Sequence, residues 1–295
     1  RRQPAPPFIT STLQQDASRR FGFQAKRTMK VAQELYEGIN LPDLGAVGLI
    51  TYMRTDSLRI SDEALSAAHD YIQRTYGENY ALAKPRTFRS KSNAQDGHEA
   101  IRPTYMEHQT IEADSAERRL YDLIWKRTIA SQMADAELEK TTATIALTGM
   151  SETFVATGEV VTFDGFLRVY RESLDDEETE DESRLLPPLK KGQKLDCGRI
   201  VAQERFTQHP PRYTEASLVR KLEELGIGRP STYAPTITTI INRGYVVKQN
   251  KDGQNRSKLE VTVDNIHFES RGERDGGYAQ QQEPSADVYD EDIPF

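Results

Sequence analysis

Cysteine is nearly absent from this sequence, which holds a single one, Cys197, among 295 residues. One cysteine excludes a disulfide within the chain, argues against a cysteine-ligated metal site and favours a reducing, cytoplasmic compartment. The five histidines do not show the paired spacing of a zinc site, so we expect no metal site in this chain. A run of about 18 apolar residues is missing too, which excludes a membrane-spanning helix.

Basic residues are fewer than acidic ones: 46 acidic residues and 39 basic ones give a net charge of -7. Many of the acidic residues, however, are concentrated in two stretches, 174–183 and 264–295. The rest of the chain is net basic, a distribution that is compatible with a nucleic-acid partner. The final part of the second stretch, 277–295, is poor in apolar residues, and we expect a disordered tail there.

The hydrophobic periodicity changes twice along the chain. Apolar residues recur every three or four positions in three segments, which predicts helices over 13–37 (with a break near Gly22), 61–77 and 115–136. A period of two then predicts strands over 141–149, 152–170 and 193–203. Helical spacing returns after Thr214 and is followed by a short strand at 245–247, the order of a winged-helix-like unit. We therefore expect a multidomain protein of α and β elements.

The segment GLITYMRTDS (48–57) places Tyr52 at the end of an apolar run that predicts a buried strand over 49–52. Side chains two positions apart on a strand point to one face, so Tyr52 and Arg54 can address the same phosphodiester. A phenol is protonated at neutral pH and needs a neighbouring positive charge or a base to act as a nucleophile. Arg54 can hold a phosphate and offset the charge that grows on it. A half-buried tyrosine beside a surface arginine is the alternative interpretation.

The segment HEAIRPT (98–104) contains a second group of polar residues. His98 could donate a proton to a leaving oxygen or bind a phosphate, and Arg102 could hold another phosphate. A histidine at a helix start with an ordinary ion pair would give the same pattern.

The segment GIGRPSTYAPTI (226–237) combines a turn arginine, Arg229, with Ser231 and Thr232 at the start of a predicted helix. Free N–H groups and hydroxyls at a helix start favour phosphate binding. Arg243, near the end of that helix, could add a contact to a DNA backbone. A simple helix cap beside a turn arginine is the alternative.

Together with PFITSTLQQDASRRFGF (7–23), these three segments closely resemble bacterial DNA topoisomerase I, the type IA family, over roughly 4–247. The resemblance implies that Tyr52 attacks single-stranded or underwound DNA and forms a 5′-phosphotyrosyl link. Strand passage and religation would then relax negative supercoils. It also implies that Arg54 positions the scissile phosphate and that His98 assists. The DNA-binding groove would contain the residues that match Arg229, Ser231, Thr232 and Arg243.

The fold implied by the resemblance is the toroidal core of the family. A mainly helical domain carrying the tyrosine would occupy 8–139, a segment of the β-rich arch 140–212 and a helical DNA-groove segment 213–247. The family cofactor is Mg²⁺, bound by a toprim domain that we do not find in this sequence. We therefore expect the isolated chain to be impaired. The alternative function is a non-catalytic module that binds single-stranded DNA.

Residues 248–295 depart from this family. KDGQNRSKLEVTVDNIHFESRG (251–272) resembles the last strands of a bacterial single-stranded DNA-binding protein, and YDEDIPF resembles the acidic tip of that family. This resemblance implies that a protein partner docks on Ile293, Pro294 and Phe295, whose terminal ring and carboxylate suit a basic-rimmed pocket. A merely solubilising tail is the alternative.

Overall fold

The computed structural model describes residues 1–41, 45–89, 97–171, 186–202, 204, 206 and 211–246. The chain forms two compact units, Arg1–Ile240 and Ile241–Phe295. The predicted acidic tail and the segment that resembles a single-stranded DNA-binding protein lie outside the described residues. In the described part of the chain, no helix is both long enough and apolar enough to cross a membrane.

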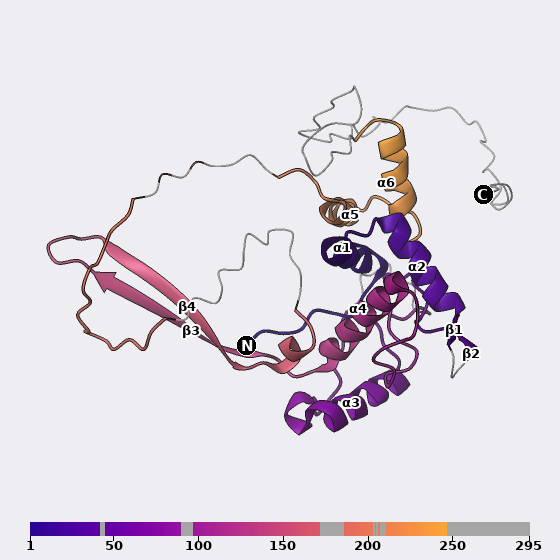
Figure 1. Cartoon of the computed structure of the whole chain (residues 1–295), viewed down its shortest axis with the longest axis horizontal. Coiled ribbons are helices and arrows are strands. Elements are labelled where there is room, and N and C mark those ends of the chain that lie inside the picture. Colours follow the sequence, from indigo (N-terminus) through magenta and orange to yellow (C-terminus); the bar gives the residue numbers. More distant parts are fainter. Residues whose placement is uncertain are drawn as a thin grey trace, which may run out of the picture. The chain divides into compact units, whose positions relative to one another are not determined.

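Helices build the main core of the first unit. Three of them pack against one another (Figure 1): α1 (Thr10–Phe21), α2 (Ala25–Glu37) and α4 (Ser115–Gln132). A fourth helix, α3 (Asp62–Tyr76), packs on α4 and continues into the short 3₁₀ helix η1 (Glu78–Tyr80). The buried residues recur at three- and four-residue spacing as the sequence predicts, with Leu13, Leu35, Ile72, Ile124 and Trp125 fully enclosed.

Local signals set the ends of these helices. The hydroxyl of Ser61 accepts the N–H of Ala64 at the start of α3, and Asp114 caps α4. A side-chain cap of this kind stabilises a helix by about 1 kcal/mol. α1 ends at Gly22, which has a φ of 65° and donates to the last turn of the helix. The predicted helix break near Gly22 is confirmed, and the helix predicted over 61–77 is capped by its first residue, Ser61.

Two short strands lie in a segment of irregular sequence after α2, β1 (Ile39–Leu41) and β2 (Gly45–Val47). A much longer antiparallel hairpin follows α4, made of β3 (Glu137–Ala146) and β4 (Thr153–Phe163). Its register pairs the two ends of the ladder directly, Glu137 with Phe163 and Ala146 with Thr153.

Three of the predicted strand segments are wrong in part. Residues 164–170 do not continue β4 but form the 3₁₀ helix η2 (Gly165–Arg168), because Phe166 and Tyr170, four positions apart, both bury their rings in the helical core. Residues 193–202 have no ladder partner among the described residues and form no strand. Tyr245 and Val246 form a bend, and Val247 lies outside the described residues.

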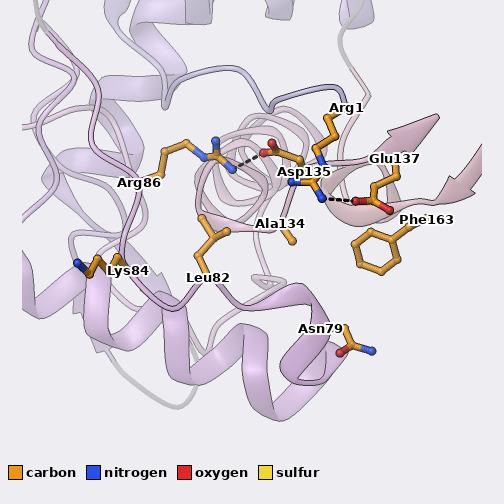
Figure 2. A pocket seen from close by; sticks show the side chains of 9 residues that line it. All are labelled: Arg1, Asn79, Leu82, Lys84, Arg86, Ala134, Asp135, Glu137 and Phe163. Atoms are coloured by element: carbon orange, nitrogen blue, oxygen red, sulfur yellow. Dashed lines mark hydrogen bonds and ion pairs between the residues drawn. The ribbon is translucent and has the colours of Figure 1, made fainter. Parts of the chain in front are cut away.

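Two ion pairs hold the root of the long hairpin, around a cavity of about 470 Å³ (Figure 2). The guanidinium of Arg86 lies 2.7 Å from the carboxylate of Asp135, just after α4. Arg1 lies 2.9 Å from the carboxylate of Glu137, the first residue of β3. The segment before α1 and the segment after η1 therefore both fasten the hairpin to the helical core.

A second, smaller core joins the last two helices, α5 (Glu215–Glu224) and α6 (Tyr233–Asn242). α5 also packs on α1, and the carboxylate of Glu215 accepts the N–H of Ala25 over 2.6 Å. Because Ala25 is the first residue of α2, this carboxylate lies at a helix N-terminus, where negative charge is stabilising. The buried side chains of this core are Ala25, Val219, Leu222, Tyr233, Ala234 and Ile237.

Candidate active site

Residues 49–55, which we call the nucleophile segment, lie against residues 100–104. The predicted strand over 49–52 is wrong, because this stretch forms only a single β-bridge, between Ile50 and Pro103. A proline has no N–H to donate, so a regular ladder does not extend through this position.

The side chain of Thr51 supplies the bonds that a ladder would otherwise make. Its hydroxyl donates to the carbonyl oxygen of Ala100 over 2.6 Å and accepts the N–H of Arg102 over 3.0 Å. Its own N–H donates to the carbonyl oxygen of Arg102 over 2.9 Å. The backbone immediately before Tyr52 is thereby held in place.

The first residue of α1 holds the backbone immediately after Tyr52. The hydroxyl of Thr10 donates to the carbonyl oxygen of Met53 over 2.7 Å and accepts the N–H of Thr55 over 2.9 Å. The N–H of Thr10 donates to the carbonyl oxygen of Thr55 over 3.0 Å. Thr10 is completely buried, so water does not compete for these bonds.

Exposure alternates along the nucleophile segment. Met53 and Thr55 are buried, whereas Tyr52 is 39% exposed and Arg54 is exposed. The segment is not a strand, yet Tyr52 and Arg54 are both exposed, as expected for side chains on one face. The residue between them and the residue after them are buried in the core. The phenol and the guanidinium are both accessible to a ligand.

Two aromatic rings flank Tyr52. The imidazole of His98 has its centroid 5.6 Å from that of Tyr52, at an interplanar angle of 62°. The ring of Tyr36, in the last turn of α2, has its centroid 5.5 Å from that of Tyr52, at 69°. Both are edge-to-face contacts, a geometry that aromatic pairs favour. The structure therefore brings together Tyr52 and His98, as the sequence predicted, and adds Tyr36.

A close backbone approach fixes Tyr36 beside Tyr52. The N–H of Leu49 donates to the carbonyl oxygen of Leu35 over 2.8 Å. At Gly48, an added Cβ would lie 2.7 Å from the carbonyl oxygen of Tyr36, which is closer than real Cβ contacts allow. Only glycine lets the chain pass the end of α2 at this distance.

Arg102 is largely occupied by protein acceptors. Its guanidinium donates to the Glu99 carboxylate over 2.6 Å, to the Pro103 carbonyl oxygen over 3.0 Å and to the Ser61 hydroxyl over 3.3 Å. The Arg102 side chain is only 12% exposed. It braces the segment that carries His98 against the start of α3, and its contact with DNA stays a prediction.

The turn before α6 presents Arg229 and Ser231 to solvent. Neither side chain has a hydrogen-bond partner among the described residues. The hydroxyl of Thr232 instead accepts the N–H of Arg229 over 2.7 Å and so closes the turn. The predicted phosphate contacts of these three residues stay predictions.

Tyr233 links this turn electrostatically to the nucleophile segment. Burial raises the pKa of Tyr233, the carboxylates of Glu223 and Asp56 raise it further, and the guanidinium of Arg229 acts in the opposite direction. Asp56 directly follows the nucleophile segment, so a charge of this turn and a charge beside that segment act on the same phenol.

The other predicted site residues, Arg243 and the three C-terminal residues, are not among those that surround Tyr52. Arg243 is exposed and belongs to the second compact unit. Ile293, Pro294 and Phe295 lie outside the described residues, so partner docking stays a prediction. Within the described ranges, no group of three or more His, Cys, Asp or Glu side chains is arranged to hold a metal ion.

Sequence reasoning missed Tyr36, Thr10 and Thr51 as parts of this site. Tyr36 recurs with the apolar residues of α2 and was therefore expected on the inner face, yet it is 41% exposed. Thr10 and Thr51 show no local pattern of their own, since their bonding partners are distant in the sequence. The run of threonine and serine at 10–12 is the first turn of α1, and it indicates a helix start and not a bond to a distant segment.

Comparison with known proteins assigns a family to this arrangement. Residues 1–261 match the family model described as DNA topoisomerase. The chain is 52% identical over 253 residues to DNA topoisomerase 1 of Xylella fastidiosa (strain Temecula1), a match that covers 83% of this chain and 31% of that protein. It is 49% identical over 260 residues to DNA topoisomerase 1 of Rickettsia bellii, covering 85% of this chain and 32% of that protein.

A solved structure agrees with these relatives. The full-length topoisomerase I of Thermotoga maritima matches with a TM-score of 0.69 and 37% sequence identity, covering 86% of this chain and 40% of that one. The chain thus spans about a third of the length of the two relatives compared above.

Proposed function

Because the chain belongs to the bacterial type IA DNA topoisomerase I family, we propose that it cleaves and reseals single-stranded DNA through Tyr52. The observation that carries this proposal is the accessible Tyr52 ring, flanked by His98 and held in a backbone that Thr10 and Thr51 fasten on both sides. A nucleophile gains most when the protein holds it in one geometry before the substrate arrives.

The proposed reaction is a transesterification. The phenolic oxygen of Tyr52 loses its proton and forms a bond to the scissile phosphorus, while the bond from phosphorus to the 3′-oxygen breaks. The departing 3′-oxygen takes up a proton and becomes a hydroxyl, leaving a 5′-phosphotyrosyl link. Attack of that hydroxyl on the link reverses every step, so religation needs no external energy source. The passage of another strand between the two steps would change the DNA topology.

Arg54 and His98 have distinct roles in this proposal. The guanidinium of Arg54 neutralises charge on the phosphate as the phosphorus becomes five-coordinate, an interaction that is strongest in the transition state. His98 would exchange a proton at the 3′-oxygen, a role that its contact with the ring of Tyr52 supports. Arg229 and Ser231 would hold the backbone of the same strand, because their side chains are exposed.

Mg²⁺ is the cofactor expected for the family. The described residues hold no group of three His, Cys, Asp or Glu side chains that could bind it. When bound to a topoisomerase, such an ion would supply positive charge near the scissile phosphate.

Covalent trapping tests the proposal. The chain is mixed with an oligonucleotide labelled at its 3′ end, with and without Mg²⁺, and quenched with denaturant and alkali. A 5′-phosphotyrosyl link retains the 3′ fragment, so the label should migrate with the protein on a denaturing gel. The same oligonucleotide labelled at its 5′ end should instead release a shorter free fragment.

Two variants complete this experiment. Tyr52→Phe should lose the labelled band and keep DNA binding, whereas Tyr105→Phe, which removes another exposed phenol, should keep both. A band that survives in Tyr52→Phe, or that carries the 5′ label, contradicts the proposal. DNA binding without any band would favour the alternative, a module that holds single-stranded DNA without cleaving it.

A further inference from the structure

The tyrosines of the described region fall into two groups. Several bury their rings or bond their hydroxyls to protein: Tyr71 to Gln109, Tyr80 to Asp164, Tyr121 to the His108 carbonyl and Tyr170 to Asp16. Tyr36 belongs to the second group, the exposed tyrosines, with Tyr52, Tyr105, Tyr213 and Tyr245: its ring is 41% exposed, and its hydroxyl has no hydrogen-bond partner among the described residues. Packing of the helical core therefore does not account for this side chain.

The position of Tyr36 is nevertheless tightly defined. Its carbonyl oxygen lies so close to Gly48 that a Cβ there would clash at 2.7 Å. Its ring meets that of Tyr52 edge to face, at a centroid distance of 5.5 Å. The backbone at Tyr36 and the contact of its ring with Tyr52 are thus defined, while the residue stays 41% exposed. A rigid, accessible aromatic ring loses little conformational freedom when it binds a planar partner.

We propose that Tyr36 is a substrate-binding residue that stacks on the nucleobase next to the scissile phosphate. This inference rests on the proposed function, since it needs the phosphate to lie at the Tyr52 hydroxyl. A base is attached within one sugar of that phosphate on either side, and the partly exposed ring of Tyr36 contacts the ring of Tyr52. Aromatic stacking suits every base, so this contact holds the strand without selecting a sequence.

The contact would also orient the reaction. His98 and Tyr36 both touch the ring of Tyr52, but imidazole can exchange protons near neutral pH, whereas Tyr36 offers mainly its ring. A base held on Tyr36 would keep the adjoining phosphate within reach of the Tyr52 hydroxyl. The expected consequence is a loss of strand affinity, together with a slower cleavage step, when the ring is removed.

Abasic substitution tests the inference directly. Single-stranded oligonucleotides with one preferred cleavage site carry an abasic nucleotide immediately 5′ or immediately 3′ of that site. One of the two should lower the affinity of the wild-type chain about 5- to 150-fold, the factor that corresponds to one base–aromatic stacking contact. Tyr36→Leu should lower the affinity for the intact oligonucleotide by a similar factor, and it should be insensitive to the same abasic substitution.

Two further measurements distinguish stacking on the Tyr36 ring from a contact with a DNA phosphate. Tyr36→Phe restores the ring and should recover most of the affinity lost in Tyr36→Leu. The dependence of affinity on salt should keep its slope in Tyr36→Leu, because stacking releases no counterions, whereas loss of a phosphate contact lowers the slope by about 1. Circular dichroism and thermal unfolding show whether each variant is folded.

Two outcomes overturn the inference. Equal abasic effects in the wild-type chain and in folded Tyr36→Leu would show that the base does not contact Tyr36. A loss in Tyr36→Phe as large as in Tyr36→Leu would place the contact at the hydroxyl instead. Failure of the proposed function is distinct, because the covalent band would then persist in Tyr52→Phe or be missing from the wild-type chain.

Discussion

The hydroxyl of Thr10 lies 2.7 Å from the carbonyl oxygen of Met53 and donates to it. Thr10 begins α1, and Met53 follows Tyr52 directly, so the start of one helix positions the backbone of the proposed nucleophile. Both residues are buried, and the bond therefore exchanges little with water. The position of Tyr52 thus depends on the packing of α1.

Removing the Thr10 hydroxyl should weaken both the fold and the cleavage step. Thr10→Val keeps the volume but leaves the carbonyl of Met53 and the N–H of Thr55 with poorer partners, at a cost of about 1–3 kcal/mol. Urea unfolding measures that loss, and the rate of covalent band formation measures the effect on Tyr52. Thr10→Ser keeps a hydroxyl and should lie close to the wild type. Equal stability of Thr10→Val and the wild type would refute this role.

A methyl group at Gly48 should displace the chain that leads to Tyr52. In Gly48→Ala, the new Cβ would meet the carbonyl oxygen of Tyr36, and relief of this clash should cost roughly 1–3 kcal/mol. Thermal unfolding should show a lower Tm, and covalent trapping should show less product. Gly198→Ala is the matched control, because an added Cβ there meets nothing within 4 Å. Similar Tm values for the two variants would contradict the close approach.

Arg102 and Arg229 should respond differently to truncation. Arg102→Ala leaves Glu99 without its guanidinium partner and should destabilise the fold by about 2 kcal/mol. Arg229→Ala should leave stability nearly unchanged but lower the salt slope of DNA binding by about 1. Parallel thermal unfolding and salt titrations of DNA binding separate the two effects. A stable Arg102→Ala variant with a reduced salt slope would instead assign Arg102 to DNA.

Tyr170 should make the stability of the chain sensitive to alkali. Its hydroxyl donates to Asp16 of α1 and accepts from Arg127 of α4 over 3.1 Å. Burial is the main reason that the pKa of Tyr170 is raised from 10.0 to about 12; Arg127 opposes this shift and Asp16 adds to it.

The sign of this effect follows from the raised pKa. Between pH 10 and 12 the unfolded chain loses the Tyr170 proton first, so the free energy of unfolding falls as pH rises. The stability that Tyr170 contributes below pH 10 should decline by ~3 kcal/mol through this whole window. In urea unfolding between pH 8 and 11.5, Tyr170→Phe should show a shallower decline, while the exposed-residue control Tyr213→Phe should match the wild type. An unchanged decline in Tyr170→Phe would count against this account.

Part of the fold could be predicted from the sequence because its signals are local. Ser61 and Asp114 start helices through bonds to residues within one turn, and Gly22 ends one in the same way. The motif around Tyr52 likewise indicated the family, which the relatives confirm. A polar pattern read within a few residues does not reveal what those residues contact across the fold.

The sequence by itself determined the approximate extent of the helices, the break near Gly22 and the identity of Tyr52 as the candidate nucleophile. Only the tertiary structure decided that hydrogen bonds of Thr51 and Thr10 hold the segment for which a strand was predicted. It also decided that the Arg102 guanidinium is hydrogen-bonded to protein acceptors and that Tyr36 stands beside Tyr52. The physical reason is the range of the interactions. Helix signals act within a turn, whereas the surroundings of Tyr52 are made by packing α1, α2 and residues 98–104 together.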